Sequence, residues 1–108
     1  MRKTLMLLTI GALVSTASLY AQAKGDPAKG KDAFAQNCDV CHNADSTETK
    51  MGPGLKGLYK KAKLNSGKPV NDANVSAQIN DGGNGMPGYK DVLSAQDKAN
   101  VLAYLKTL

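Results

Sequence analysis

Cys38-Asp39-Val40-Cys41-His42 is the most informative motif of this 108-residue sequence. Positions i, i+3 and i+4 lie on one face at a helix end, so both thiols and the imidazole converge on one object. The chain has no other cysteine and no other histidine. Any site that uses cysteine or histidine ligands must therefore use this motif.

The spacing suits two thioether bonds to the vinyl groups of a porphyrin and one bond from the imidazole to its iron. Cys-x-x-Cys-His is the signature of c-type haem attachment, with Cys38 and Cys41 as the covalent anchors and His42 as the proximal iron ligand. A chance match in a chain this short is on the order of one in a thousand. The motif predicts one covalently attached haem c.

Three other interpretations of the motif compete with haem. A zinc site needs four Cys or His ligands, and only three such residues exist. A thioredoxin-like dithiol belongs to a strand–helix–strand pattern, and no run of the sequence alternates as a strand does. An inert disulfide is chemically possible, but it leaves His42 without a role.

Residues 1–23 have the features of a secretory signal peptide. Met1-Arg2-Lys3 is a short cationic head, Leu5–Leu19 is apolar, and Ala21-Gln22-Ala23 is a small-residue cleavage site. The apolar run is too short and too interrupted to predict a membrane span. We expect cleavage after Ala23, a domain over residues 24–108 and a periplasmic location; retention of the segment as an anchor stays open.

The predicted domain is poor in the side chains that build an ordinary core. Leu, Ile, Val and Phe make up 14 of its 85 residues, below the roughly 20% at which disorder becomes a serious prospect. Small domains bury little apolar surface and usually need a disulfide, a metal or another stabilising group. The composition excludes a multidomain enzyme and a disulfide-rich scaffold. It leaves two alternatives, a largely disordered chain or a chain folded around something that is not protein.

Three helices are predicted from capping residues and helical periodicity. The first runs from about Pro27 to Val40 behind Asp26, and the second runs from about Asp72 to Asn80. The third follows Ser94, whose spacing to Asp97 is that of a capping box. A short helical turn is possible near residues 56–61, and breaker-rich loops fill the rest. The fold class is therefore all-α, with three to five helices wrapped around the haem.

With these features, residues 26–108 resemble a small bacterial class I, mono-haem cytochrome c. In that family a methionine far along the chain supplies the second axial ligand. Gly85-Met86-Pro87-Gly88-Tyr89 is similar to the family's methionine loop and follows His42 by 44 residues. The resemblance implies Met86 as the distal iron ligand, on a loop whose glycines let the backbone approach the haem.

Met51 is the rival of Met86, and it lies only nine residues after His42. Its neighbours Gly52-Pro53-Gly54 resemble the family's proximal loop instead. There the Pro53 carbonyl would accept a hydrogen bond from the ring nitrogen of His42 that does not bind iron, fixing the tautomer. Met51 is then expected to fill the core.

The resemblance also implies packing and pocket residues. Gly30, Phe34 and Tyr104 match the place where the first and last helices cross. Residues 24–108 lack the Trp and Arg with which many relatives hold the haem propionates. Tyr59, Lys60 or Lys61, and backbone amides before Asp72, are the candidates for that role. The expected haem wall comprises Leu55, Leu58, Tyr59, Val75, Ile79, Val92, Val101 and Leu105.

The resemblance and the absence of an acid–base pair predict a soluble periplasmic electron carrier, not an enzyme. Two strong axial ligands leave the iron no open position. The alternatives are a haem-based sensor or enzyme that binds small ligands at a labile sixth position, and a dithiol oxidoreductase without haem. Residues 50–68 carry six lysines and no carboxylate, which favours redox partner proteins with acidic surfaces. We expect a monomer that binds no nucleic acid.

Overall fold

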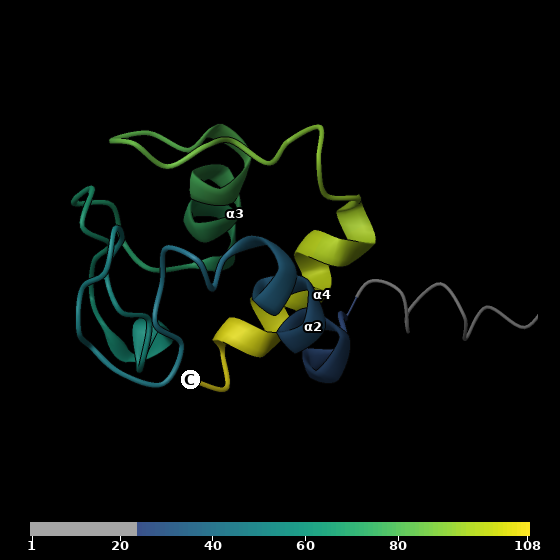
Figure 1. Ribbon diagram of the computed structural model, residues 1–108, viewed down its shortest axis with the longest axis horizontal. Coiled ribbons are helices and arrows are strands. Elements are labelled where there is room, and N and C mark those ends of the chain that lie inside the picture. Colours follow the sequence, from purple (N-terminus) through teal and green to yellow (C-terminus); the bar gives the residue numbers. More distant parts are fainter. Residues whose placement is uncertain (1–23) are drawn as a thin grey trace, which may run out of the picture.

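The computed structural model describes residues 24–108, and the predicted signal peptide lies outside them. Three α-helices follow one another along the chain, α2 (Pro27–Asn37), α3 (Asp72–Asp81) and α4 (Ala95–Leu105), with a 3-10 turn, η1 (Leu58–Lys60), before α3 (Figure 1). Between residues 24 and 108 the only β pairings are isolated bridges. The all-α prediction of three to five helices is confirmed.

Each helix begins where the sequence supplies a side chain for its free amides. The Asp26 carboxylate accepts from the amides of Ala28 and Lys29 at the start of α2, and the Asn71 side chain accepts from Asn74 at the start of α3. At α4 the predicted capping box is present, with Ser94 and Asp97 exchanging side-chain and backbone hydrogen bonds. No helix within the described part of the chain is both long and apolar enough to cross a membrane.

Helix α2 ends earlier than predicted, at Asn37 rather than at Val40. The amides of Cys38 and Asp39 both donate to the Phe34 carbonyl, at 2.8 and 3.0 Å, so the regular i to i−4 register stops there. A turn follows, in which the amides of Cys41 and His42 both donate to the Cys38 carbonyl, at 3.1 and 3.0 Å. This turn, and not the helix itself, preserves the spacing of the motif.

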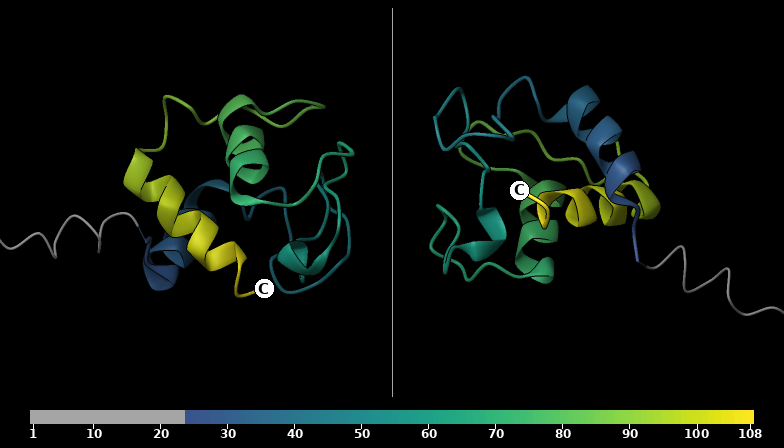
Figure 2. Two further views of the ribbon diagram at one scale, coloured as in Figure 1. Left: turned by 180° about the vertical axis from the view of Figure 1, so that it is seen from behind. Right: turned by 90° about the horizontal axis from the view of Figure 1, so that it is seen from below.

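Helices α2 and α4 pack directly against each other (Figures 1 and 2). Gly30 makes this possible, because a Cβ atom there would overlap the Asn100 carbonyl of α4. The rings of Phe34 and Tyr104 meet edge to face beside the crossing, with centroids 5.4 Å apart. The predicted crossing of the first and last helices is confirmed.

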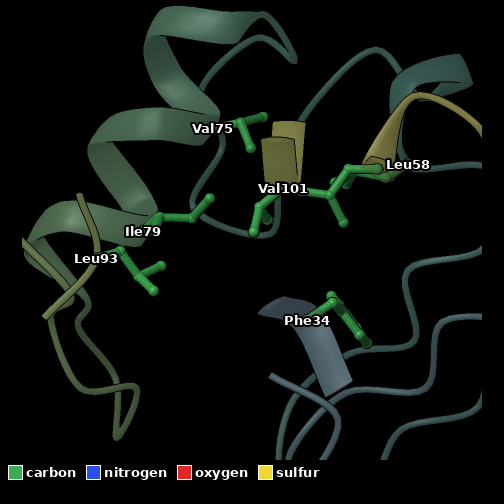
Figure 3. Close-up of a cluster of buried hydrophobic side chains, with 7 residues drawn as sticks. Phe34, Leu58, Val75, Ile79, Leu93 and Val101 are labelled. Atoms are coloured by element: carbon green, nitrogen blue, oxygen red, sulfur yellow. The ribbon is translucent and has the colours of Figure 1, made fainter. Parts of the chain in front are cut away.

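The core is a small cluster of buried apolar side chains drawn from all the helical elements. Figure 3 shows it, and its members are Phe34, Leu58, Val75, Ile79, Leu93, Val101 and Leu105. Seven residues are few for a domain of this length, as the composition predicts. The loops at residues 38–70 and 82–90, seen beside α3 in Figure 2, therefore lie over space that protein side chains do not fill.

Candidate functional site

That space is a cavity of about 400 Å³, within the range of sites that bind cofactors. The motif, both glycine-rich loops and the segment after η1 all line it. Its apolar wall consists of Leu55, Leu58, Leu64, Val75, Ile79, Tyr89 and Leu105. Cys38, Cys41, His42, Pro53 and Met86 line the same cavity, so the structure brings together five of the six predicted site residues.

The imidazole of His42 is held in one orientation by the loop at residues 51–54. Its Nδ1 lies 2.7 Å from the Pro53 carbonyl oxygen, which is the contact expected from the sequence. A carbonyl oxygen only accepts, so Nδ1 carries the proton and Nε2 keeps its lone pair. Gly52 packs on the ring, and a Cβ atom there would come within 2.5 Å of Cε1. The loop thus presents a neutral imidazole with one free nitrogen.

The two cysteines are free and half-buried. Burial, and secondarily the neighbouring Cys41, raises the pKa of the Cys38 thiol to about 11. Dithiol oxidoreductases depend on the opposite shift, because the thiolate is the attacking species. Across residues 24–108 no three Cys, His, Asp or Glu side chains form a group suited to a metal ion. Both findings count against the dithiol and zinc interpretations.

Met86 sits on a tight loop that is folded by residues with positive φ. Gly82, Gly83, Asn84 and Gly85 have φ between 51° and 121°, and the amide and carbonyl of Gly83 pair with those of Met86 at 2.9 and 3.0 Å. The Met86 side chain is partly buried, and its sulfur lies 3.7 Å from the Gln78 amide nitrogen of α3. A thioether is thereby fixed at the cavity wall.

Met51 differs from Met86 in burial. It is 82% exposed, so the expectation that it fills the core is wrong. Its sulfur lies 3.9 Å from the Cys41 sulfur, and Met51 also lines the cavity. The exposed side chain of Met51 contrasts with that of Met86, which is partly buried and contacts Gln78.

Three of the residues expected around the haem lie away from the cavity lining. The Tyr59 hydroxyl donates to the Asp72 carboxylate at 2.9 Å, and the Lys106 ammonium donates to the same carboxylate at 2.9 Å. Val92 is 65% exposed, because it lies in a turn before α4. Val101 is buried in the core that α4 shares with the other helices. None of the three lines the cavity.

Several lining residues were missed by reasoning from sequence. Tyr89 closes the methionine loop onto the motif, since its hydroxyl donates to the Asn37 carbonyl at 2.9 Å. Burial raises the pKa of Tyr89. The others are Lys63, Leu64, Asn65, Ser66 and Gln78. Gln78 follows Val75 by three residues on one face of α3 and could have been found from helical spacing; the loop residues carry no such signal.

The residues around the cavity fit a haem c. Two thiols stand three residues apart for thioether bonds, a neutral imidazole offers Nε2, and a thioether offers sulfur. The remaining wall is mainly apolar, as a porphyrin face requires. Imidazole with thioether is also the ligand pair that iron takes in cytochromes c.

Comparisons with known proteins agree with this donor set. Residues 25–105 match the family model described as cytochrome C oxidase, cbb3-type, subunit III. The chain is 33% identical to cytochrome c6 of Synechocystis sp., over 92% of this chain and 78% of that protein. It is also 33% identical to cytochrome c2 of Rhodomicrobium vannielii, over 97% and 96% of the two chains.

Solved structures resemble the fold. The crystal structure of cytochrome c6 from the diatom Phaeodactylum tricornutum superposes with a TM-score of 0.59 and 28% identity, over 77% of this chain and 93% of that one. Cytochrome cH from Methylobacterium extorquens superposes with a TM-score of 0.55 and 32% identity, over 78% and 100% of the chains. The similarity therefore covers the whole described domain.

Proposed function

Because this chain belongs to the family of small class I, mono-haem cytochromes c, we propose that it is a periplasmic electron carrier with iron held between His42 and Met86. Members of this family transfer electrons and are not enzymes, and the family implies one covalently bound haem c. We assign the thioether bonds to Cys38 and Cys41.

The observation that carries this proposal is the convergence of four side chains from distant segments on one cavity. His42 and Met86 are 44 residues apart in sequence, and both line it together with the two cysteines. When bound, the haem supplies an iron that exchanges one electron between the ferric and ferrous states. The protein residues keep that exchange fast by holding nearly the same geometry in both states.

Each ligand side chain has a neighbour that restrains it. The Pro53 carbonyl accepts from His42 Nδ1, which orients the ring and strengthens donation from Nε2. The Gln78 amide donates towards the Met86 sulfur, which limits electron donation from that ligand. The apolar wall excludes water from the remaining space. Second-shell hydrogen bonds and burial of this kind set the potential of a haem protein.

The surface beside Cys41 supports an encounter with redox partner proteins. Val40, which precedes Cys41, is 72% exposed, and Met51, whose sulfur contacts that of Cys41, is 82% exposed; Cys41 itself lines the cavity. Six lysines and no carboxylate occupy residues 50–68, so the surrounding loops are cationic. An apolar centre with a basic rim fits a partner whose docking surface is acidic around an apolar centre.

The ligand assignment is tested by comparing two methionine variants. We expect Met86→Ala to lose the sulfur-to-iron charge-transfer band of the oxidised protein, to bind cyanide or carbon monoxide, and to have a lower potential. Met51→Ala is the matched control and should keep the band and the potential. The reverse pattern would overturn the assignment. A wild-type protein that lacks the band and binds carbon monoxide would instead be a small-ligand-binding haem protein.

The docking proposal is tested with charge reversals that spare the cavity. Lys56, Lys60 and Lys68 are exposed and do not line it. We expect the triple change of these lysines to Glu to slow electron transfer to an acidic acceptor roughly tenfold or more at low salt, with little effect near 1 M salt. The control reverses Lys24, Lys29 and Lys31, at the α2 end of the molecule. Equal slowing by both triples would leave net charge, and no docking surface, as the cause.

A further inference from the structure

Residues 24–108 contain four sulfur-bearing side chains, and all four line the cavity. They are Cys38, Cys41, Met51 and Met86. The function proposed above, on which this inference rests, gives the two cysteines to thioether bonds and Met86 to the iron. We propose that Met51 is a redox-sensitive modification site, whose oxidation by peroxides to the sulfoxide weakens the docking of partner proteins and leaves the haem ligands in place.

The two methionines present their sulfur atoms to solvent very differently. Met51 is largely exposed, whereas Met86 is partly buried and its sulfur lies 3.7 Å from the Gln78 amide nitrogen. A peroxide reacts with a lone pair of the thioether sulfur, and susceptibility to oxidation follows exposure. The lone pair of Met86 is the one assigned to iron. Met51 therefore combines an exposed sulfur with a lone pair that no metal holds.

The backbone holds Met51 at the motif although its side chain is exposed. The Lys50 amide donates to the Gly52 carbonyl at 3.0 Å, and the Gly52 amide donates to the Cys41 carbonyl at 2.8 Å. The Lys50 ammonium donates to the Asp39 carbonyl at 3.1 Å. With both neighbours held in this way, the Met51 sulfur lies 3.9 Å from the Cys41 sulfur. Oxidation of Met51 therefore changes the surface directly beside a haem attachment residue.

The oxidation balances with hydrogen peroxide as the only other reactant. A lone pair of the thioether sulfur attacks one peroxide oxygen, the O–O bond breaks and an S–O bond forms. The second oxygen leaves as water with both protons. The sulfur gives up two electrons and the peroxide takes them. The product side chain is polar and carries no net charge.

The sulfoxide would stand in the apolar centre of the proposed docking surface, to which Val40 and Met51 contribute exposed side chains. Docking removes water from such a centre. The sulfoxide oxygen then loses its hydrogen bonds to water and meets no donor on an apolar partner surface. The charge of the lysines at residues 50–68 does not change, so their attraction for an acidic partner is kept. Oxidation should therefore weaken docking without changing its salt dependence.

The first part of the test locates the modification. The oxidised holoprotein is treated with a limiting amount of hydrogen peroxide and analysed by peptide mass spectrometry. We expect the first added oxygen on Met51, while the sulfur-to-iron band and the potential stay close to their starting values. Oxygen found first on Met86 or on a haem thioether would overturn the proposal. So would loss of the band in step with oxidation of Met51.

The second part measures docking by electron transfer from the reduced, singly oxygenated protein to an acidic acceptor protein. We expect this transfer to be slower by about fivefold or more, and by the same factor at low and high salt, because an unpaired polar group and not a charge is the cause. Transfer to hexacyanoferrate(III), which has no apolar docking surface, should not change. Methionine sulfoxide reductase should restore the rate, because it regenerates the thioether.

Two variants separate the sulfur of Met51 from other targets of peroxide. In Met51→Leu the side chain stays apolar and similar in volume but has no sulfur. Its transfer rate should be the same before and after peroxide treatment. Met51→Gln is a permanent polar analogue and should slow transfer to the acceptor protein without peroxide.

Equal slowing of wild type and Met51→Leu by peroxide would overturn the proposal, as would a Met51 sulfoxide that transfers electrons at the untreated rate. A wild-type protein without covalent haem would contradict the proposed function itself. A protein with haem and the sulfur-to-iron band, in which oxidation of Met51 has no effect on transfer, would contradict only this inference.

Discussion

The two halves of the molecule are held together in different ways. In the pair formed by α2 and α4, protein meets protein: Gly30 lies against the Asn100 carbonyl, and Phe34 meets Tyr104 edge to face. In the other half, loops from both sides of α3 line a cavity of about 400 Å³. In the helix pair, protein side chains and backbone contact each other directly. In the cavity half, part of the apolar wall has no protein side chain packed against it.

The difference shows where stability has to come from. The helix pair is held by hydrogen bonds as well as by apolar rings. The Asn100 side chain accepts from the Asp26 backbone amide at 2.7 Å and from the Gln96 side-chain amide at 2.9 Å. The cavity half has hydrogen bonds of its own, such as those from His42 to Pro53 and from Tyr89 to Asn37, but it also has an apolar cavity wall. An unfilled apolar wall forfeits its dispersion contacts outright. We therefore expect the bound haem to supply the missing contacts and to stabilise the fold of that half.

The largest expected effect comes from removing the haem attachment. In Cys38→Ser/Cys41→Ser prepared without haem, we expect the cooperative thermal transition and most helical circular dichroism to be lost. Fourteen Leu, Ile, Val and Phe residues cannot offset a chain entropy of roughly 1–2 kcal/mol per residue over 85 residues. Val40→Ala is the control within the same motif, because Val40 is exposed, and it should melt like wild type.

The same double variant also separates the two halves. Amide hydrogen exchange should show the least residual protection at residues 38–90, where the walls depend on the cofactor. Any protection that survives should lie in α2 and α4. A haem-free double variant that melts cooperatively with native helicity would show that the cavity half is stable on its own, and the comparison drawn above would fail.

A smaller effect is expected from disturbing the helix pair. Gly30→Ala places a Cβ atom against the Asn100 backbone, where a flexible side chain cannot yield in its place. We expect the holoprotein to lose about 1–3 kcal/mol in the free energy of unfolding, the usual cost of overpacking. Lys31→Ala changes the next residue of α2, which is exposed, and should cost little. The absorption spectrum of the haem should stay unchanged in both variants if the halves are independent.

The sequence predicted the helix pair better than the cavity half. Capping residues and periodicity located the starts of α2, α3 and α4, and the glycine and aromatic residues of the crossing were named correctly. Caps and periodicity are local signals, whereas Gly30, Phe34 and Tyr104 were expected from the resemblance to the family. The predicted end of α2 was three residues too late. The helix ends where the amides of Cys38 and Asp39 both donate to the Phe34 carbonyl, and no sequence pattern predicts that hydrogen bonding.

For the site, the motif was identified from the spacing of its residues, whereas the roles of the two glycine-rich loops came from the resemblance to the family. The contact between His42 and Pro53, which that resemblance implied, is present. Lys63, Asn65 and Ser66 were not found, and Tyr59, which was expected beside the haem, does not line the cavity. Loop residues have no periodicity, so the side of the chain that faces the cavity depends on long-range hydrogen bonds such as that of Leu64 with Lys68.

The smallest effect concerns the polar link between the two halves. Asp72 at the start of α3 accepts from Tyr59 of η1 and from Lys106 after α4, and the Lys106 ammonium also lies 5.6 Å from the centre of the Tyr59 ring. The hydrogen bond from Lys106 is the main cause that lowers the pKa of Asp72. Burial, followed by the hydrogen bond to Asp72, raises the pKa of Tyr59. Both Asp72 and Lys106 are about half exposed.

The directions of these two pKa shifts predict that the free energy of unfolding falls both in acid and in alkaline solution. A lowered pKa at Asp72 contributes stability above the ordinary carboxyl value of about 4, and that stability is lost as the pH falls below it. A raised pKa at Tyr59 contributes stability below about pH 10, and that stability is lost in more alkaline solution. Since the ion pair is exposed to solvent, we expect about 1 kcal/mol or less from it at neutral pH.

The measurement is the free energy of unfolding of the holoprotein between pH 3 and pH 7, at low and high salt. Asp72→Asn should flatten the acid limb slightly, and Lys106→Met should reduce stability at neutral pH by a similar small amount that salt abolishes. Asp91→Asn removes an exposed carboxylate that takes no part in the link and serves as the control. If the free energy of unfolding falls equally in acid for Asp72→Asn and for wild type, this polar link does not stabilise the protein, and the two halves are joined by the haem and the apolar core alone.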